Sequence, residues 1–311
     1  MKALISGSTG LIGSAFLEKH GSFFDQVFTI GRDAGDHDSH IRYDLSKNED
    51  IDLPDVDVFF HFASQTSLNS SFKNVEKDLM TNVVGFVKLL EILRNKNKKP
   101  IVIAASTATQ VGYTDNIYPH KKDLPDKPIT FYDLSKLTAE RYLLNYVNEG
   151  WLKGCSLRLC NVYGGSKDYG ANDRGIIDKI FIKAVNGEKI NVFNGGEFVR
   201  DYIYIEDVVD SFLEAFKNID NTNNGIYYIG SGNGITVKDA FTLAQNIASE
   251  IQEKQYKILS IDDPSMASTM NSRSFVPDII EFCNHTGWKP KYNLEQGLRH
   301  CYKEILPSGN E

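Results

Sequence analysis

The chain has 311 residues, of which 41% are hydrophobic and 24% charged, a composition typical of a globular protein with one large domain or two fused ones. Its 34 Lys and Arg residues against 41 Asp and Glu residues give a formal net charge of −7, so it lacks the basic footprint of a nucleic-acid-binding protein. No stretch reaches the roughly 18 apolar residues of a membrane span, and the glycines that interrupt the apolar N-terminus argue against a signal peptide. The four scattered cysteines predict neither a disulfide scaffold nor a metal site. We therefore expect a cytoplasmic protein with reduced thiols.

Apolar, strand-like runs alternate with segments of helical periodicity through the first half of the chain. The expected strands are Lys2–Ser6, Gln26–Ile30, Val56–Phe60, Ile101–Ala105 and Cys155–Leu159. The expected helices are Gly10–Lys19, Asp78–Arg94 and Tyr132–Asn148. Strands that alternate with helices form βαβ units, so the predicted fold class is α/β, with a Rossmann-type, doubly wound parallel sheet.

Glycine and asparagine become frequent after about Gly165, and the helical segments become shorter. We therefore expect a dinucleotide-binding domain at residues 1–165 and a smaller C-terminal substrate-binding lobe at residues 166–311, with segments of about 201–232 returning to the first domain. We find no internal repeat and no low-complexity tract.

A glycine-rich loop joins the first expected strand to the first expected helix. Glycines here permit a tight turn, close approach of the backbone to a pyrophosphate and close packing of the helix on the sheet, and the helix directs its N-terminal N–H groups at the phosphates. A glycine-rich loop without a ligand is the alternative, but its place after a terminal strand favours a dinucleotide site. The loop residues predicted to bind the cofactor are Gly7, Ser8, Thr9, Gly10, Leu11, Ile12 and Gly13.

The end of the second strand indicates which cofactor binds. An Asp or Glu there would bind the ribose 2′-hydroxyl of NAD, but the strand ends in Gly31 and Arg32. Since Arg32 can pair with a 2′-phosphate, we expect NADP, with NAD as the alternative. Asp33 could still reach a ribose, and Arg32 could be no more than a solvated charge.

A catalytic acid/base is suggested by a Tyr and a Lys four residues apart, which share one face of a helix. The pattern occurs three times, at Tyr43/Lys47, Tyr118/Lys122 and Tyr132/Lys136, so the spacing alone identifies nothing. Only Tyr132 opens a long helical segment.

The pair Tyr132/Lys136 also follows a strand that ends in Ser106 and Thr107, and ligands of open α/β sheets bind at such carboxyl ends. Thr107 or Ser106 can hydrogen-bond the reacting oxygen of the substrate, and the positive charge of Lys136 would favour the phenolate of Tyr132. Three unconnected surface residues are the alternative.

Further motifs extend along nearly the whole chain. They are Tyr43-Asp44-Leu45, Val58-Phe59-Phe60-His61-Phe62-Ala63, Asn82-Val83-Val84-Gly85, Asn161-Val162-Tyr163-Gly164, residues 196–207 and Gly287-Trp288-Lys289-Pro290. With the glycine loop and Tyr132/Lys136, this ordered set resembles the extended short-chain dehydrogenase/reductase family, the NAD-dependent epimerase/dehydratase group.

The resemblance implies a role for each matching residue. Asp44 and Leu45 would flank the adenine; Phe62, Ala63 and Asn82 would line the cofactor cleft. Tyr132 would be the acid/base, Lys136 would hold the nicotinamide ribose, and Thr107, preceded by Ser106, would be the hydroxyl partner. Asn161 and Arg200 would contact the diphosphate of a nucleotide sugar, unless Arg200 forms a salt bridge to Asp201 or Glu206.

Three departures narrow the expected activity. Ala108-Thr109 replaces the Asp-Glu pair that follows the catalytic Thr of 4,6-dehydratases, which argues against dehydration. Gln110-Val111-Gly112 replaces the usual Val-Tyr-Gly, and no Arg-Pro-Gly-Asp segment occurs around Asp262–Met266.

The leading expectation is therefore oxidoreduction of a nucleotide-diphosphate sugar, most simply C4 epimerisation through a 4-keto intermediate. An NADPH-dependent reductase of nucleotide 4-keto sugars and a non-catalytic NADP-binding sensor or scaffold are the alternatives. The resemblance also implies a homodimer that pairs through Asp78–Arg94 and Tyr132–Asn148, with Met80, Val84, Tyr142 and Tyr146 off the core face.

Overall fold

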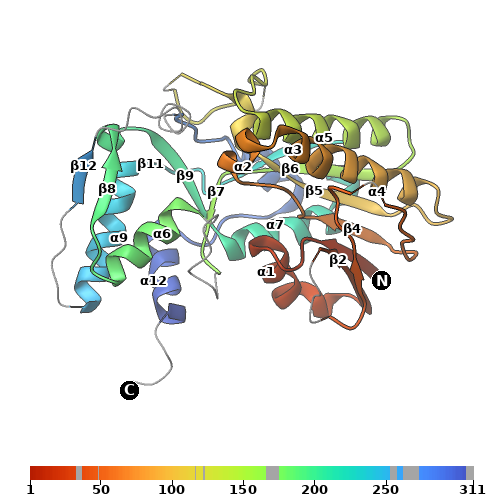
Figure 1. Cartoon of the computed structure of the whole chain (residues 1–311), viewed down its shortest axis with the longest axis horizontal. Helices are drawn as coiled ribbons and strands as arrows, with labels where there is room; N and C mark the ends of the chain where they lie inside the picture. Colours follow the sequence, from red (N-terminus) through yellow and green to blue (C-terminus); the bar gives the residue numbers. More distant parts are fainter. Residues whose placement is uncertain are drawn as a thin grey trace.

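The computed structural model describes residues 1–32, 37–47, 49–115, 117–121, 123–165, 175–252, 258–261 and 273–305 (Figure 1). Within these residues, seven parallel strands form one sheet in the order β10-β6-β5-β4-β1-β2-β3. The strands are β1 (Lys2–Ser6), β2 (Gln26–Gly31), β3 (His40–Arg42), β4 (Val58–His61), β5 (Ile101–Thr107), β6 (Lys153–Leu159) and β10 (Ile226–Ile229).

The strand order reverses at β1, which pairs with β2 on one side and with β4 on the other. Such a switch point leaves a crevice beyond the carboxyl ends of the strands, where open α/β sheets bind their ligands. The predicted Rossmann-type α/β fold is therefore confirmed, and each of the five expected strands is present with ends shifted by at most two residues.

Helices cover both faces of this sheet. Figure 1 shows α1 (Leu11–His20) and α7 (Ile205–Lys217) on one face, and α4 (Gly85–Arg94) and α5 (Phe131–Asn148) on the other. Successive residues of a strand point to opposite faces. Accordingly, Phe60 packs in one buried cluster with residues of α1 and α7, and its neighbour Phe59 packs in another with residues of α4 and α5.

The helix expected at Asp78–Arg94 consists of three successive pieces. It begins as α3 (Val75–Leu79), passes through a π-helical turn at Met80–Val84 and continues as α4. A short helix that the sequence did not suggest, α2 (Leu68–Lys73), precedes it. Ser67 and Asn74 cap α2 and α3 by accepting hydrogen bonds from backbone N–H groups, which is why two such short helices can form side by side.

Most of the remaining elements form a smaller region at the end of the molecule opposite the N-terminus (Figure 1). Strands β7 (Asn161–Tyr163), β9 (Val199–Tyr204) and β11 (Gly234–Thr236) form one small sheet, and β8 (Ile190–Phe193) and β12 (Ile258–Ile261) form another. Its helices are α6 (Ile176–Val185), α9 (Val237–Gln252) and α12 (Leu294–Ile305), whereas α8 (Ile219–Thr222) and α11 (Ile280–Thr286) pack at the β10–β6 edge of the large sheet. In the part of the chain that the structure describes, no helix is long and apolar enough to cross a membrane.

Candidate active site

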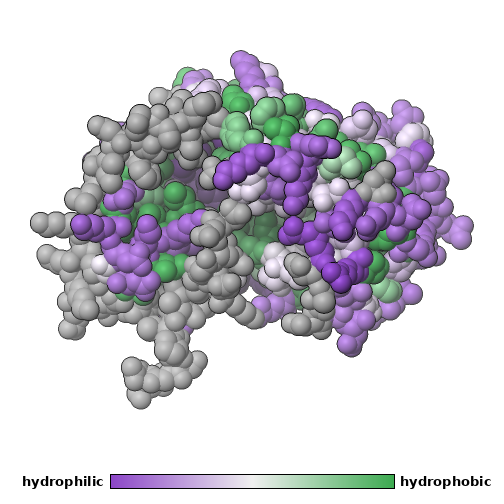
Figure 2. Space-filling model, viewed as in Figure 1, coloured by the Kyte–Doolittle hydropathy of each residue, from purple (hydrophilic) through white to green (hydrophobic). Residues whose placement is uncertain are grey.

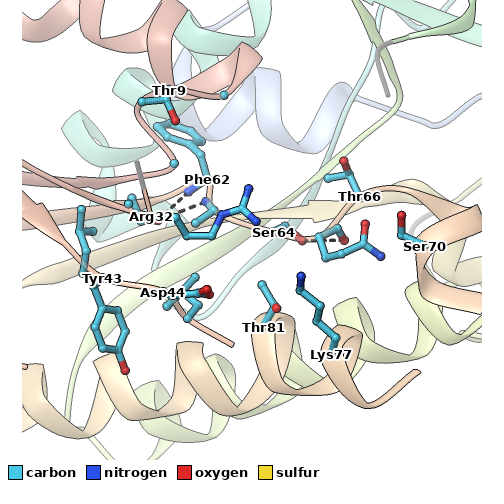
Figure 3. Close-up of a pocket in the computed structure, with 18 of the residues that line it drawn as sticks. Thr9, Arg32, Tyr43, Asp44, Phe62, Ser64, Thr66, Ser70, Lys77 and Thr81 are labelled. Atoms are coloured by element: carbon cyan, nitrogen blue, oxygen red, sulfur yellow. Dashed lines mark hydrogen bonds between the residues drawn. The ribbon is translucent and has the colours of Figure 1, made fainter. Parts of the chain in front are cut away.

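A cleft of about 580 Å³ opens beyond the carboxyl ends of β1, β2 and β4 (Figure 3). This volume lies within the range of ordinary cofactor and ligand pockets. Eight of the residues predicted to bind the cofactor line it: Gly7, Thr9, Gly10, Arg32, Asp44, Leu45, Phe62 and Ala63.

The glycine loop is shaped by two positions that tolerate no side chain. Gly7 has φ +71°, and a Cβ atom there would lie 2.7 Å from the backbone nitrogen of Ala63. At Gly13 a Cβ atom would lie 2.2 Å from the carbonyl oxygen of Gly7. The loop after β1 is thereby held against the loop after β4 and against the first turn of α1, with the backbone of Gly10 left open to the cleft. The predicted residues Ser8, Leu11, Ile12 and Gly13 do not line the cleft.

Arg32 lies exposed at the end of β2, and Asp44 lines the cleft nearby. Partial burial alone would raise the pKa of Asp44, but hydrogen bonds from the backbone N–H and hydroxyl of Ser46, with the positive charge of Arg32, lower it. The cleft therefore carries both a cation and a carboxylate at its β2 end. Asp33, the alternative ribose partner, lies outside the described residues.

The opposite wall of the cleft was missed by sequence reasoning. It consists of polar residues from the loop after β4 and from α2, α3 and the π-helical turn: Ser64, Gln65, Thr66, Ser70, Lys73, Asn74, Lys77 and Thr81. Figure 3 shows Lys77 pointing into the cleft from α3. Lys77 and Thr81 are four residues apart, a spacing that places both on one helix face, but the helices are too short for their periodicity to stand out.

Asn82 links the cleft to the catalytic helix. Its side-chain oxygen accepts hydrogen bonds from the Ser64 hydroxyl (2.9 Å) and the Gln65 N–H (2.8 Å). Its amide nitrogen donates to the hydroxyl of Ser135 on α5 (3.0 Å). Asn82 is buried and does not line the cleft, so its contact with a cofactor stays a prediction.

The predicted catalytic residues meet where β5 ends and α5 begins. Thr130 caps α5 by accepting a hydrogen bond from the Asp133 N–H (3.0 Å). The hydroxyl of Tyr132 is hydrogen-bonded to Thr107. The ammonium group of Lys136 donates to the carbonyl oxygen of Ala105 (2.8 Å). The three side chains are thus brought together by backbone elements that the sequence predicted.

The protonation behaviour of this group differs from the expectation. Burial, together with the negative charges of Asp133 and Asp78, raises the pKa of Tyr132, whereas we expected Lys136 to lower it. Burial lowers the pKa of Lys136 to about 8, against the opposing effect of Glu140 and Asp78. The neutral phenol of Tyr132 is therefore the favoured form in this structure.

Among the described residues, the Tyr43/Lys47 pair does not form a comparable site. The Tyr43 hydroxyl donates to the carbonyl oxygens of Lys47 (3.4 Å) and Glu49 (3.3 Å), so it serves a local turn. Tyr118 packs edge-on against His120, and Lys122 lies outside the described residues.

The predicted substrate residues lie at the carboxyl end of β5, on β7 and on β9. Ser106 is buried and accepts a hydrogen bond from the amide of Gln110, the residue that departs from the family pattern. Asn161 donates from its side-chain amide to the carbonyl oxygen of Asp201 (2.8 Å).

Arg200 is unusual among the arginines of the chain. Burial, followed by the nearby positive charge of Arg273, lowers its pKa to about 10. The carboxylate of Asp201 accepts hydrogen bonds from Ser231 and Gly232, and Glu206 pairs with Lys19, so the two carboxylates considered as alternatives have other partners. Arg273 itself pairs with the Asp133 carboxylate (2.7 Å), so Arg200 is the guanidinium whose charged form is disfavoured here.

The parallel sheet, the cleft at its switch point and the Tyr/Lys helix beside it define a Rossmann-type fold with a cleft where such folds bind dinucleotides. The chain belongs to the NAD-dependent epimerase/dehydratase family, because residues 3–230 match the family described as "NAD dependent epimerase/dehydratase family".

Similar proteins come from several organisms. A putative UDP-glucose 4-epimerase of Methanocaldococcus jannaschii is 27% identical over 95% of each chain. A dTDP-4-dehydro-6-deoxyglucose reductase of Escherichia coli is 29% identical over 83% of this chain and 78% of its own. The crystal structure of a UDP-glucose 4-epimerase from Thermotoga maritima with UDP-glucose is 26% identical, covers 98% of each chain and superposes with a TM-score of 0.84.

Proposed function

We propose that the protein inverts C4 of a nucleotide-diphosphate sugar through a 4-keto intermediate. The observation that carries this proposal is the group of Thr107, Tyr132 and Lys136 at the carboxyl edge of the sheet, linked to the cofactor cleft through Asn82 and Ser135. The similarity to UDP-glucose 4-epimerases over almost the whole chain supports it.

The cleft fits a nicotinamide dinucleotide. Gly7 and Gly13 leave no room for a Cβ atom, and Gly10 presents open backbone at the start of α1, where phosphates bind N–H groups. When bound, this cofactor supplies an acceptor and then a donor of hydride.

The proposed chemistry needs one proton carrier. In oxidation, Tyr132 takes the proton of the C4 hydroxyl as hydride leaves the carbon, and the keto sugar forms. After the sugar presents its other face, hydride returns and Tyr132 gives the proton back to the oxygen. Thr107 hydrogen-bonds the same oxygen and orients it, and Lys136, placed one helical turn from Tyr132, holds the nicotinamide ribose.

Arg200 and Asn161 are proposed to contact the substrate's diphosphate, with residues 166–311 as the substrate-binding lobe. The support is electrostatic: Arg200 is desolvated beside Arg273, and its pKa is lowered accordingly. A bound diphosphate would favour the charged form of Arg200, which burial and the nearby Arg273 disfavour.

The proposed cofactor preference is NADP over NAD. Gly31 offers no carboxylate to a ribose 2′-hydroxyl, and Arg32 stands exposed on the rim of the cleft. A charge-assisted hydrogen bond from its guanidinium to a 2′-phosphate is the contact that NAD lacks.

A second candidate is an NADPH-dependent reductase of nucleotide 4-keto sugars. Arg32 favours it because such a reductase oxidises one NADPH per turnover and must bind the 2′-phosphate that Arg32 is proposed to contact. Sugar labelled with deuterium at C4 distinguishes the two. An epimerase returns the deuterium to C4 of the product with no net consumption of cofactor. A reductase oxidises one NADPH per 4-keto sugar, followed at 340 nm. Cofactor binding without turnover of any nucleotide sugar or 4-keto sugar would contradict both and leave a non-catalytic NADP-binding protein.

We further propose a homodimer that pairs through α3–α4 and α5. Figure 2 shows hydrophobic surface over the region of α2 and α5. The exposed apolar residues of α2, α3 and α5 are Phe72, Val75, Leu79, Phe131, Leu134 and Tyr142. Tyr142 is 44% exposed as expected, but Tyr146 is only 6% exposed and donates to Glu91, so it belongs to the core. Light scattering that gives the mass of a monomer at micromolar concentration would contradict this proposal.

A further inference from the structure

The cofactor cleft is lined by more positive than negative side chains. Its charged lining residues are the cations Arg32, Lys73 and Lys77 and the carboxylate Asp44. The positive charge of Arg32 acts on Asp44 at one end of the cleft. The two lysines lie on the wall formed by α2 and α3, and in the part of the chain that the structure describes neither side chain forms an ion pair. Since the chain as a whole has a formal net charge of −7, this excess of positive charge is local to the cleft.

The backbone of Lys77 is held in place, whereas its side chain is exposed. Its N–H donates to the side-chain oxygen of Asn74 (2.9 Å), the cap of α3. The next residue, Asp78, is 2% exposed and accepts a hydrogen bond from the Gln65 amide (2.9 Å), which ties α3 to the loop after β4. Figure 3 shows the Lys77 side chain pointing into the cleft. The start of this side chain is therefore fixed, and its ammonium group is presented to a ligand.

The apolar face of α3 points in another direction. Val75 is 40% exposed and Leu79 is 48% exposed, and the two are one helical turn apart. Lys77 lies two residues from each of them, which is about 200° around the axis of an α-helix. A homodimer that covers Val75 and Leu79 would therefore leave Lys77 directed toward the cleft.

The glycine loop lies on the other side of the cleft. Figure 3 shows Thr9 of this loop and Lys77 on opposite sides. Gly10 is the N-cap residue of α1 and makes no side-chain cap hydrogen bond, so the first N–H groups of this helix are available to a phosphate. A diphosphate bound by these N–H groups would present its other side to the wall that carries Lys77.

We propose that Lys77 is a cofactor-binding residue whose ammonium group pairs with the diphosphate of the bound dinucleotide, from the wall opposite the glycine loop. This inference deepens the proposed function and rests on it for the ligand of the cleft. It separates two tasks: Arg32 contacts the 2′-phosphate that only NADP carries, and Lys77 contacts a group that NAD and NADP share. Retention of the cofactor matters to an epimerase, because the hydride must return to the sugar from the same cofactor molecule.

The test is the affinity of Lys77→Met for both cofactors, measured by calorimetric titration. Methionine keeps an unbranched side chain and removes the charge. We expect the Kd values of NAD and NADP to rise together, by about five- to tenfold, because a hydrogen bond between charged groups is strong but this one lies at the exposed edge of the cleft. Lys77→Arg keeps the charge and should retain most of the affinity.

Two further variants serve as controls. Lys183→Met removes the same charge from an exposed lysine of α6 that does not line the cleft, and both Kd values should stay at the wild-type level. Arg32→Ala should weaken the binding of NADP alone. Because Arg32 and Lys77 are proposed to contact different phosphate groups, their effects on NADP should add in the double variant.

The salt dependence of binding distinguishes a charge contact from a packing effect. Salt screens a pair of opposite charges, so the Kd of NAD should rise less steeply with ionic strength in Lys77→Met than in the wild type or in Lys183→Met. Equal slopes in these three proteins would contradict the inference.

The affinities themselves give two more ways to overturn it. If Lys77→Met and Lys183→Met bind both cofactors equally well, Lys77 does not contact the cofactor. If Lys77→Met weakens NADP binding and leaves NAD binding unchanged, the assignment to the diphosphate is wrong. The titrations contain no sugar, so a wild type that binds as expected and converts no nucleotide sugar would contradict the proposed function and leave the role of Lys77 standing.

Discussion

Two parts of the site are built differently. One is the loop after β1, and the other is a hydrogen-bonded network in which the Asp133 carboxylate accepts from Thr109 and from Arg273. The loop depends on missing side chains at Gly7 and Gly13, and its contacts are made by neighbouring backbone. The network depends on buried charges, one of which arrives from residue 273. A site for a common cofactor can be made from local backbone, whereas control of a proton needs charged groups that only the folded chain brings together.

The largest expected effect is at the proton carrier. Tyr132→Phe keeps the ring and removes the transferable proton, so kcat should fall by about 10²–10⁴, the usual contribution of general acid–base catalysis. Cofactor affinity should stay near that of the wild type. The controls Tyr43→Phe and Tyr118→Phe make the same change in the two other Tyr/Lys motifs and should retain activity. A greater loss of kcat in either control would mean that the site has been misplaced.

The backbone side of the comparison is tested at Gly13. A Cβ atom 2.2 Å from the Gly7 carbonyl oxygen forces the loop to move, and overpacking of this kind costs about 1–3 kcal/mol. We expect Gly13→Ala to raise the cofactor Kd about tenfold or more, while kcat at saturating cofactor changes little. In the control Gly21→Ala, the Cβ atom meets only the flexible side chain of Leu17, and cofactor affinity should be retained. Equal affinities in the two variants would show that the loop does not hold the cofactor.

Arg200 should affect binding more than chemistry. Its proposed partner is a diphosphate remote from the reacting carbon, a contact that is similar in the ground and transition states. Arg200→Ala should therefore raise KM by about tenfold, which corresponds to about 1.4 kcal/mol of lost binding free energy, with little change in kcat. A loss of kcat at saturating substrate with KM unchanged would assign Arg200 to the chemical step.

The smallest effect is expected at the exposed rim of the cleft. Because Arg32 is solvated, its bond to a 2′-phosphate should contribute about 1 kcal/mol, so Arg32→Ala should weaken NADP binding several-fold and leave NAD binding unchanged. Calorimetric titration with both cofactors measures the ratio. Equal affinity of the wild-type protein for NAD and NADP would contradict the proposed preference.

Prediction from the sequence succeeded where the signal is local. The glycine loop lies between adjacent elements, and Tyr132 and Lys136 lie within one long helix that follows β5, so helical periodicity and position after a strand were enough to place them on their elements. Thr109 was noted only as a departure from the family pattern, although it lies two residues after Thr107. Its hydroxyl contacts both Thr107 and Asp133, and Asp133 pairs with Arg273. No local sequence pattern connects these residues.

Two failures have a different physical origin. Lys77 reaches the cleft from a helix of five residues, too short to show a periodic face. The pKa of Tyr132 was expected to fall because of Lys136 and the positive charge of an oxidised nicotinamide, while burial and two carboxylates raise it in the structure. Desolvation depends on the whole packed environment, which spacing along the chain does not report.

The side chain of Asn82 has a consequence for redesign of this protein. One amide group positions the wall of the cleft at Ser64 and Gln65 and also the helix that bears Lys136, through Ser135. A substitution at Asn82 or at its partners in that wall would therefore shift both the cleft wall and the catalytic helix. Exchange of one dinucleotide for the other is therefore better attempted at Arg32, which lies exposed on the rim of the cleft at the end of β2.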